Sequence, residues 1–80
     1  MNVTVLLFAS YAESLGKTSL VMPLNTGDTV GDVVSRIRSL PGAGTLPVEP
    51  LVAVNERYAK RDRVLAAGDE VAIIPPVAGG

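Results

Sequence analysis

The chain has 80 residues, of which 48% are hydrophobic and 4% aromatic, and its formal net charge is −1. A chain of this length forms one domain with a thin core, and some apolar surface is expected to stay outside that core as a partner site. The charge disfavours a nucleic-acid binder, and the lack of Cys and His excludes a disulfide, a thiol nucleophile, an imidazole base and the usual zinc ligands.

The first third of the chain predicts two strands joined by a short helix. Residues 2–9 are apolar on both alternating faces, which is typical of a central strand. This stretch lacks the length and basic residues of a signal peptide and is too short to span a bilayer, so we expect a cytoplasmic protein without membrane contact. Ser10 to Glu13 has capping-box spacing and Gly16 is a helix stop. Residues 17–24 predict a second strand, placed at a sheet edge by Pro23.

The longest predicted element is a helix that begins after Thr29. This residue can cap the helix together with Asp32. One apolar stripe follows at helical spacing, formed by Val30, Val33, Val34, Ile37 and Leu40. Pro41-Gly42 ends the helix, and the Gly- and Pro-rich segment 41–50 predicts a loop.

The second half predicts three short strands. In chain order we expect a strand at 51–54, a turn at Asn55-Glu56, a strand at 57–59, a helical turn at 64–66, a turn at Gly68-Asp69 and a strand at 70–74. Pro75-Pro76 ends the last strand because proline has no N–H to donate. The order ββαβββ predicts an α+β domain over residues 1–74 with one main helix across one face of a mixed sheet.

Residues 75–80, Pro-Pro-Val-Ala-Gly-Gly, are the candidate site. The diproline favours an extended start, and six extended residues reach at most roughly 20 Å. A frayed chain end or the remnant of a cloning linker could also end in Gly-Gly. However, this segment carries no charged side chain, which favours a thin arm that threads into a partner and delivers the terminal carboxylate of Gly80.

A terminal carboxylate has a defined chemistry. It is ionised at neutral pH, with a pKa of about 3.5, and is therefore a poor electrophile until it is activated as an acyl-adenylate. Exchange of one oxygen for sulfur then gives a thiocarboxylate, a good sulfur nucleophile. A chain without cysteine can carry sulfur in this way, and glycine leaves the carbonyl unhindered.

Three segments resemble the small subunits of molybdopterin synthase. They are the C-terminal run 67–80, Leu6-Leu7-Phe8-Ala9 and Val52-Ala53-Val54-Asn55. The resemblance implies a ubiquitin-like β-grasp fold with a mixed sheet of about five strands and a flexible C-terminal tail. The short loop Pro41 to Pro50 departs from the family pattern, which leaves partner contacts there open.

The resemblance also implies partners and roles. A ubiquitin-activating-type adenylyltransferase would activate Gly80 with ATP and magnesium, and a sulfur-transfer protein would form the thiocarboxylate. The large synthase subunit would accept the tail (Pro75, Pro76, Val77, Ala78 and Gly79) and use the sulfur to make molybdopterin from cyclic pyranopterin monophosphate. The chain would then be a sulfur donor in molybdenum cofactor biosynthesis, not an enzyme on its own, with no metal or cofactor of its own.

Other residues admit two interpretations each. Phe8 is a core residue or a partner anchor. Ile73 and Ile74 point to opposite faces, so one is core and the other is interfacial. The basic cluster of Arg57, Lys60, Arg61 and Arg63 is a solvated face or a docking site. The acidic residues Asp28, Asp32, Asp69 and Glu70 are explained by helix caps and turns rather than by a metal.

Three other functions remain open from the sequence. A thiamine-pathway sulfur carrier would share the fold and tail chemistry, although the diproline favours the molybdopterin pathway. A ubiquitin-like modifier would use the same activated Gly80 to form isopeptide bonds with lysines. A plain β-grasp interaction module would need no tail chemistry, so its tail would be dispensable.

Overall fold

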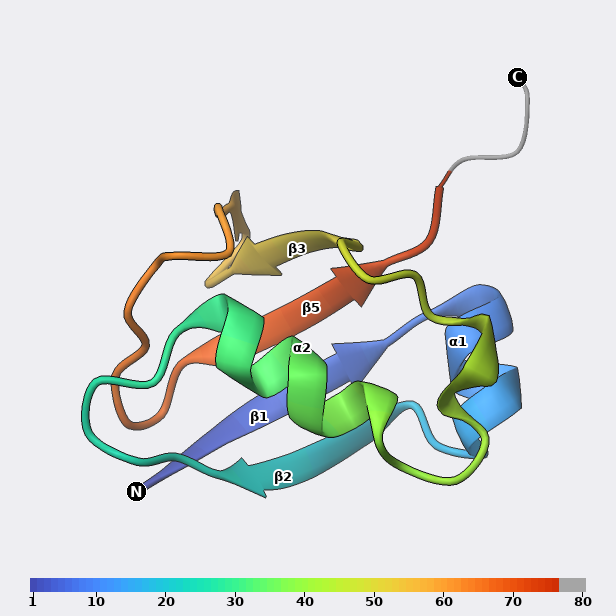
Figure 1. Ribbon diagram of the computed structural model, residues 1–80, viewed down its shortest axis with the longest axis horizontal. Helices are drawn as coiled ribbons and strands as arrows, with labels where there is room; N and C mark the ends of the chain where they lie inside the picture. The colour runs from blue at the N-terminus through green and yellow to red at the C-terminus, as the bar shows by residue number, and fades with distance from the viewer. Residues whose placement is uncertain (77–80) are drawn as a thin grey trace.

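A computed structural model describes residues 1–76, so the expectations for Val77 to Gly80 lie outside the described residues. The elements are β1 (Asn2–Leu7), α1 (Ala9–Leu15), β2 (Ser19–Pro23), α2 (Val30–Arg38), a 3₁₀ turn η1 (Ala43–Thr45), β3 (Leu51–Val54), β4 (Arg57–Tyr58) and β5 (Glu70–Ile74). Figure 1 shows α2 lying across the sheet, with the chain leaving beyond the end of β5. No helix within residues 1–76 is long and apolar enough to cross a membrane.

The five strands form one mixed sheet in the order β2-β1-β5-β3-β4. β1 and β5 run parallel, and every other pair is antiparallel. β1 is therefore a central strand and β2 an edge strand, as the apolar faces of β1 and the position of Pro23 predict. The α+β β-grasp architecture expected from the sequence is confirmed.

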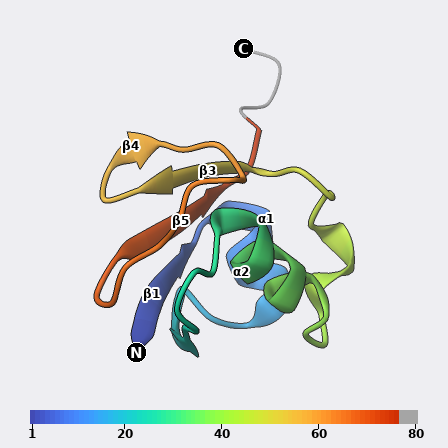
Figure 2. The ribbon, with the colours of Figure 1, turned by 60° about the vertical axis from the view of Figure 1, so that its left-hand side comes forward.

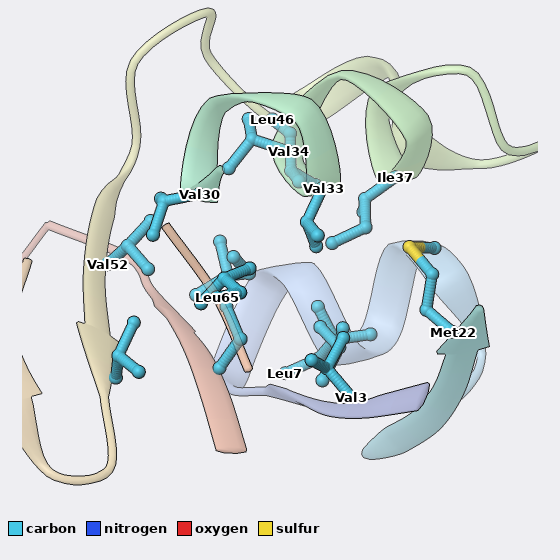
Figure 3. Packing of buried hydrophobic residues seen from close by; sticks show 14 of the residues in the cluster. Val3, Leu7, Met22, Val30, Val33, Val34, Ile37, Leu46, Val52 and Leu65 are labelled. Carbon is cyan, nitrogen blue, oxygen red and sulfur yellow. The ribbon is translucent and has the colours of Figure 1, made fainter. Parts of the chain in front are cut away.

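Both helices cover the same face of the sheet (Figure 2). Val3, Val5 and Leu7 alternate along β1 toward this covered face and are buried, because successive strand side chains point to opposite sides. Figure 3 shows Val33 and Ile37 of α2 pointing toward the side of the sheet that carries Val3 and Leu7. The core is almost entirely aliphatic, and within residues 1–76 no helix lies on the opposite face of the sheet.

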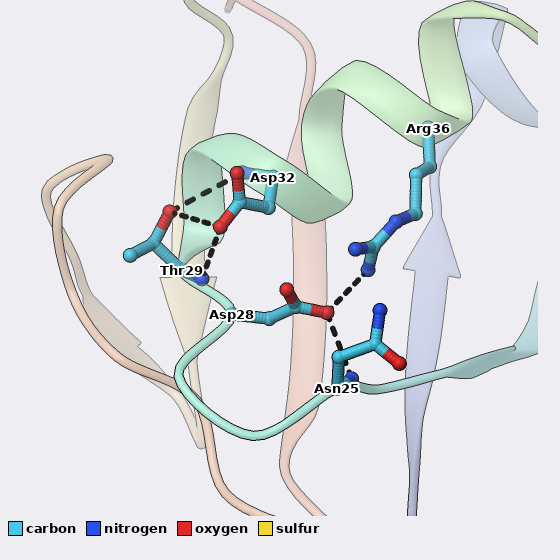
Figure 4. A network of polar contacts seen from close by, with 5 residues as sticks. All are labelled: Asn25, Asp28, Thr29, Asp32 and Arg36. Carbon is cyan, nitrogen blue, oxygen red and sulfur yellow. Dashed lines mark hydrogen bonds and ion pairs between the residues drawn. The ribbon is translucent and has the colours of Figure 1, made fainter.

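The capping of α2 agrees with the sequence. The Thr29 backbone N–H donates to Asp32 Oδ2 at 2.9 Å, and the Asp32 N–H donates to Thr29 Oγ1 at 3.3 Å (Figure 4). This reciprocal pair satisfies N–H groups that have no partner inside the helix. The helix ends at Arg38. Leu40, the last member of the expected apolar stripe, therefore lies beyond the helix, with 36% of its surface exposed.

Two local predictions are wrong. α1 begins at Ala9 with Phe8 as its N-cap and no side-chain capping bond, so the Ser10 to Glu13 capping box does not form. Residues 64–66 are not helical: Val64 forms an isolated bridge with Thr29, and the Leu65 N–H donates to the Asp28 carbonyl. Residues 60–65 instead lie against the start of α2.

Other boundaries agree closely with the sequence. Gly16 ends α1 in the left-handed conformation, with φ of 72°. β1 ends two residues earlier than expected and β4 one residue earlier. The loop at 41–50 contains η1, whose Ala43 is buried, as is Leu46 just after it. This loop therefore contributes to the core.

Candidate functional site

The tail begins where β5 leaves the sheet. Ile74 is the last residue of β5 and pairs with Leu51 of β3, while the neighbouring Ile73 pairs with Leu7 of β1. Pro75 follows at once and is half-buried, and Pro76 is exposed. The root of the tail is thus flanked by β3 on one side and by the end of β1 on the other.

Ile73 and Ile74 point to opposite faces of the sheet. Ile73 has 0% exposure and lies in the hydrophobic core, whereas Ile74 is half-buried on the face that no helix covers. The alternation of β5 predicts opposite faces, and the structure assigns the core role to Ile73. Ile74 is therefore the candidate for contact with a partner.

Phe8 lies beside Ile74 and not in the core. Phe8 directly follows β1 in an extended conformation, so its side chain shares the helix-free face with Leu6, and it is 46% exposed. Treating Phe8 as a core residue is therefore wrong. The structure instead brings it next to Ile74 at a shallow hollow of the open sheet face.

This hollow extends across four strands. It is lined by Leu6, Phe8, Ala53, Glu56, Tyr58, Glu70, Ala72 and Ile74. On the exposed surface of the sheet, Tyr58, Leu51 and Val21 are 73%, 50% and 66% exposed. An apolar surface continuous over several strands is typical of a protein–protein contact. We name the eight lining residues the open-face hollow.

Sequence reasoning found Phe8 and Ile74 but missed the other members of the open-face hollow. The register of β5 against β3 brings Ala72 opposite Ala53, and that of β3 against β4 brings Ala53 opposite Tyr58. Register depends on pairing between distant strands and is not visible in one strand's pattern. The only available signal was the alternation along each strand, which placed Ala72 on the same face as Ile74.

The acidic residues near α2 and β5 have local structural roles. Asp28 is 9% exposed, and its carboxylate accepts from the Arg36 guanidinium and from the Asn25 N–H at 2.8 Å (Figure 4). These bonds, that of Arg36 foremost, lower the pKa of Asp28. Asp69 accepts from the Ala66 N–H at 2.8 Å and from Asn55 Nδ2 at 2.9 Å, which lowers its pKa as well. Caps and turns account for both residues.

The basic cluster begins on β4, where Arg57 lies between Glu56 and Tyr58 of the open-face hollow, and continues in the segment after this strand. Its four residues Arg57, Lys60, Arg61 and Arg63 are exposed. Arg61 Nη1 contacts Glu49 Oε1 at 3.0 Å, and the Arg61 carbonyl accepts from the Gly31 N–H at 2.8 Å. Arg61 therefore lies beside the N-terminus of α2.

Known proteins resemble this chain over its whole length. A molybdopterin synthase sulfur carrier subunit of Dictyostelium discoideum is 34% identical over an alignment of 80 residues. This alignment covers 95% of this chain and 93% of the relative. The crystal structure of SAMP1 from Haloferax volcanii superposes with a TM-score of 0.85 at 30% identity and full coverage of both chains. A complex of subunits 1 and 2 of molybdopterin-converting factor from Helicobacter pylori gives a TM-score of 0.74 at 18% identity with full coverage of both chains, which establishes the shared fold alone.

The match to a family is equally extensive. The ThiS family pattern covers residues 5–80, which include nearly every described element and the C-terminal segment. The chain therefore belongs to the ThiS family.

Proposed function

We propose that this chain is the sulfur carrier subunit of molybdopterin synthase. The observation that carries the proposal is its full-length identity of 34% to a protein of that name. The fold supports it, because β5 ends at Ile74, a residue of the exposed apolar surface, and Pro75-Pro76 follow directly. In this proposal residues 1–74 are the globular domain, and residues 75–80 form the arm that enters a partner.

The working group in this proposal is the terminal carboxylate of Gly80. One carboxylate oxygen attacks the α-phosphorus of ATP, pyrophosphate leaves, and an acyl-adenylate forms. Sulfur at the oxidation level of sulfide then attacks the acyl carbon and AMP leaves, which produces a thiocarboxylate. Its sulfur attacks a carbon of cyclic pyranopterin monophosphate and displaces an oxygen from that carbon, and water then cleaves the acyl–sulfur bond of the resulting thioester, which leaves the sulfur on the product and restores the carboxylate.

The chemistry requires other proteins, since the chain alone has neither Cys nor His. An adenylyltransferase would supply ATP and magnesium, a sulfur-transfer protein would supply the sulfur, and the large subunit would supply the catalytic side chains. Of these partners, the large subunit is supported by the complex of subunits 1 and 2 of molybdopterin-converting factor from Helicobacter pylori, a protein of the same fold. The chain is then a donor subunit that acts in the cytoplasm, with Phe8 and Ile74 in the interface.

Intact mass spectrometry tests this function directly. The chain is co-expressed with its activating enzyme and a sulfur source, and the control omits the activating enzyme. We expect a mass gain of one sulfur-for-oxygen exchange, located at Gly80, only in the complete system. Sulfur at another residue, or none under conditions that sulfurate a known carrier, would refute the carrier function.

A second candidate function is protein modification. It is favoured by the 30% identity to SAMP1, because a related structure of Haloferax volcanii carries the name small archaeal modifier protein 1. The activated Gly80 carboxyl would then acylate a lysine amine. Mass spectrometry of tagged chain from its own cells would distinguish the two, since a modifier leaves Gly80–lysine isopeptides on other proteins and a dedicated carrier leaves none.

A further inference from the structure

A groove lies beside the first turns of α2. It is bordered by residues 48–50, which precede β3, and by residues 59–61, which follow β4, and its volume is about 400 Å³, a size typical of binding sites. Buried valines of α2 and β3 form its floor, and Figure 3 shows Val30 and Val52 close together there. Within residues 1–76 this groove and the open-face hollow share no lining residue. We name this site the α2 groove and define it by Val30, Val34, Val48, Val52, Lys60 and Arg61.

Val48 extends the apolar floor of the α2 groove to the surface. It is exposed in the loop before β3, yet it lines the groove together with the buried Val30 and Val34. A ligand side chain that covers Val48 and the floor would remove apolar surface from water, which is favourable in proportion to the area covered. The α2 groove therefore suits an aliphatic side chain.

Another part of the lining is basic. Lys60 and Arg61 belong to the basic cluster, which holds four of the seven basic residues of a chain whose net charge is −1, so positive charge is concentrated here. Glu49 is the one acidic residue of the lining, and it pairs with Arg61. Lys60 has no ion-pair partner within residues 1–76. The α2 groove therefore favours a ligand with a negative charge next to its aliphatic group.

Gly31 leaves room for the Arg61 side chain at the α2 groove. A Cβ at Gly31 would lie 3.3 Å from Arg61 Nε and 3.3 Å from the Arg61 carbonyl oxygen. Glycine is less favourable than alanine inside a helix, and the arginine packed against it accounts for its presence here. The ion pair of Arg61 with Glu49, in contrast, joins side chains that are 57% and 73% exposed, so it contributes little stability. A carboxylate of a ligand can therefore replace Glu49.

We propose that the α2 groove binds an extended peptide segment of a partner protein in which an aliphatic side chain is flanked by carboxylates. The aliphatic side chain would lie on the valine floor beside Val48. One flanking carboxylate would pair with Lys60, and another would replace Glu49 at Arg61. This surface is separate from the tail and from the open-face hollow, so the chain can hold one protein here while its tail is engaged by another.

NMR titration of the isotope-labelled full-length chain with synthetic peptides tests the proposal. The probe is acetyl-Glu-Asp-Ile-Asp-Glu-amide. One control peptide replaces its acidic residues by glutamine and asparagine, and a second replaces its isoleucine by serine. We expect the probe to move the amide signals of residues 30–34, 48–52 and 59–61 and to leave that of Ala72 in the open-face hollow unchanged. Each control peptide should bind roughly fivefold more weakly or worse.

Matched variants test the charges of the α2 groove. The double variant Lys60→Gln, Arg61→Gln should weaken the Kd of the probe by roughly threefold to tenfold, as expected for two exposed ion pairs. Its control, Arg57→Gln with Arg63→Gln, removes two charges of the same basic cluster from residues that do not line the groove, and should bind like the wild type.

Two single variants test the remaining contacts. Glu49→Gln should bind the probe more tightly than the wild type, because it removes the carboxylate that competes for Arg61. Glu13→Gln, an exposed change on α1, is its control and should leave the Kd unchanged. Val48→Ser should weaken binding at an unchanged melting temperature, since Val48 is exposed in the free protein.

The outcomes are distinct. Loss of affinity in the Lys60 and Arg61 double variant alone, together with weak binding of both control peptides, supports the proposal. Equal Kd values for the three peptides, or wild-type binding by that double variant, would overturn it. It is also overturned if the peptide Pro-Pro-Val-Ala-Gly-Gly, the sequence of residues 75–80, binds here as tightly as the probe, because the occupant is then the chain's own tail. Self-association that the double variant abolishes would instead identify a second copy as the occupant and overturn it as well.

Discussion

The Asp28 carboxylate connects α2 to the turn that precedes it. It accepts from Arg36 on the helix and from the Asn25 backbone within the turn. These bonds hold its pKa below the ordinary value of 3.8. A carboxyl group whose pKa is lower in the folded state stabilises the fold above its unfolded pKa, and this contribution is lost as the pH falls through the folded pKa.

We therefore predict that Asp28→Asn lowers the melting temperature at pH 7, and that its difference from the wild type shrinks as the pH falls below 3.8. Thermal unfolding followed by circular dichroism over a pH series measures this. Asp62→Asn is the control, because Asp62 is exposed and makes no side-chain hydrogen bond with the residues that the structure describes. A difference between Asp28→Asn and the wild type that stays constant down to acidic pH would contradict the assignment.

Ile73 and Ile74 form a matched pair for separating stability from binding. Ile73 is fully buried, so Ile73→Ala should cost about 2–5 kcal/mol of unfolding free energy. Ile74→Ala should cost clearly less, because its side chain already meets solvent, yet it should weaken binding to the large subunit by about 1 kcal/mol or more. Urea unfolding and calorimetric titration measure the two effects. Equal unfolding costs would contradict the assignment of Ile73 to the core and Ile74 to the surface, and normal binding of Ile74→Ala would place the interface elsewhere.

At the scale of residues, the sequence predicted which positions alternate but not always which face is covered. In β1 both faces are apolar, so Phe8 looked like a core residue. Its exposure of 46% follows from its place on the face that carries no helix, which it shares with Leu6, and the chain turns into α1 only at the next residue, Ala9, where φ is 47°. That turn is a left-handed conformation at a non-glycine residue, which no sequence signal predicts.

Gly42 shows how one residue sets the packing of two elements. Its φ is +88°, and a Cβ at this position would collide with the Ser14 carbonyl oxygen of α1. Gly42 precedes η1, which packs against α1. The absence of a side chain therefore allows the loop to approach the helix closely.

We predict that Gly42→Ala destabilises the protein by at least about 1–2 kcal/mol, the cost of a left-handed conformation for a residue with a Cβ, with a further cost for displacing α1. Gly44→Ala is the control, since Gly44 has no close neighbour and no positive φ. Chemical denaturation compares the two variants. Equal stability of Gly42→Ala and Gly44→Ala would show that η1 and α1 do not depend on this contact.

Elements with a strong local sequence signal were predicted correctly, whereas elements with a weak sequence signal were not. α2 has a side-chain cap and a periodic apolar stripe, and its start was correct to the residue. α1 has only seven residues and no side-chain cap, so its start depends on packing rather than on a local motif. Residues 64–66 pair with the start of α2 through Thr29 and Asp28, which are more than thirty positions away.

In the whole molecule, the residues that form the hydrophobic core are distinct from the segment that is proposed to react. The buried residues of the hydrophobic core lie between Val3 and Ile73 in the sequence and include neither Pro75 nor Pro76. The parallel pairing of β1 with β5 brings the first strand of the chain beside the last, so the root of the tail rests on the most central pair of the sheet. The fold class and the end of β5 before Pro75-Pro76 were predictable from the sequence, whereas the hollow beside that end required the strand register.

The length of the arm is the last prediction and concerns the whole chain. The Gly80 carbonyl carbon has to reach the reactive groups of two different partners, and a misplacement of about 1 Å can cost roughly a hundredfold in rate. Deletion of Gly80 shortens the reach by about 3.5 Å, and an added residue lengthens it equally. We expect both changes to abolish molybdopterin formation in a reconstituted assay while the melting temperature stays at the wild-type value, because the core ends at Ile73. Gly79→Ala keeps the length but adds a methyl group and restricts the backbone, so it should retain partial activity. Molybdopterin formation at a normal rate by the Gly80 deletion would exclude the terminal carboxylate as the sulfur carrier.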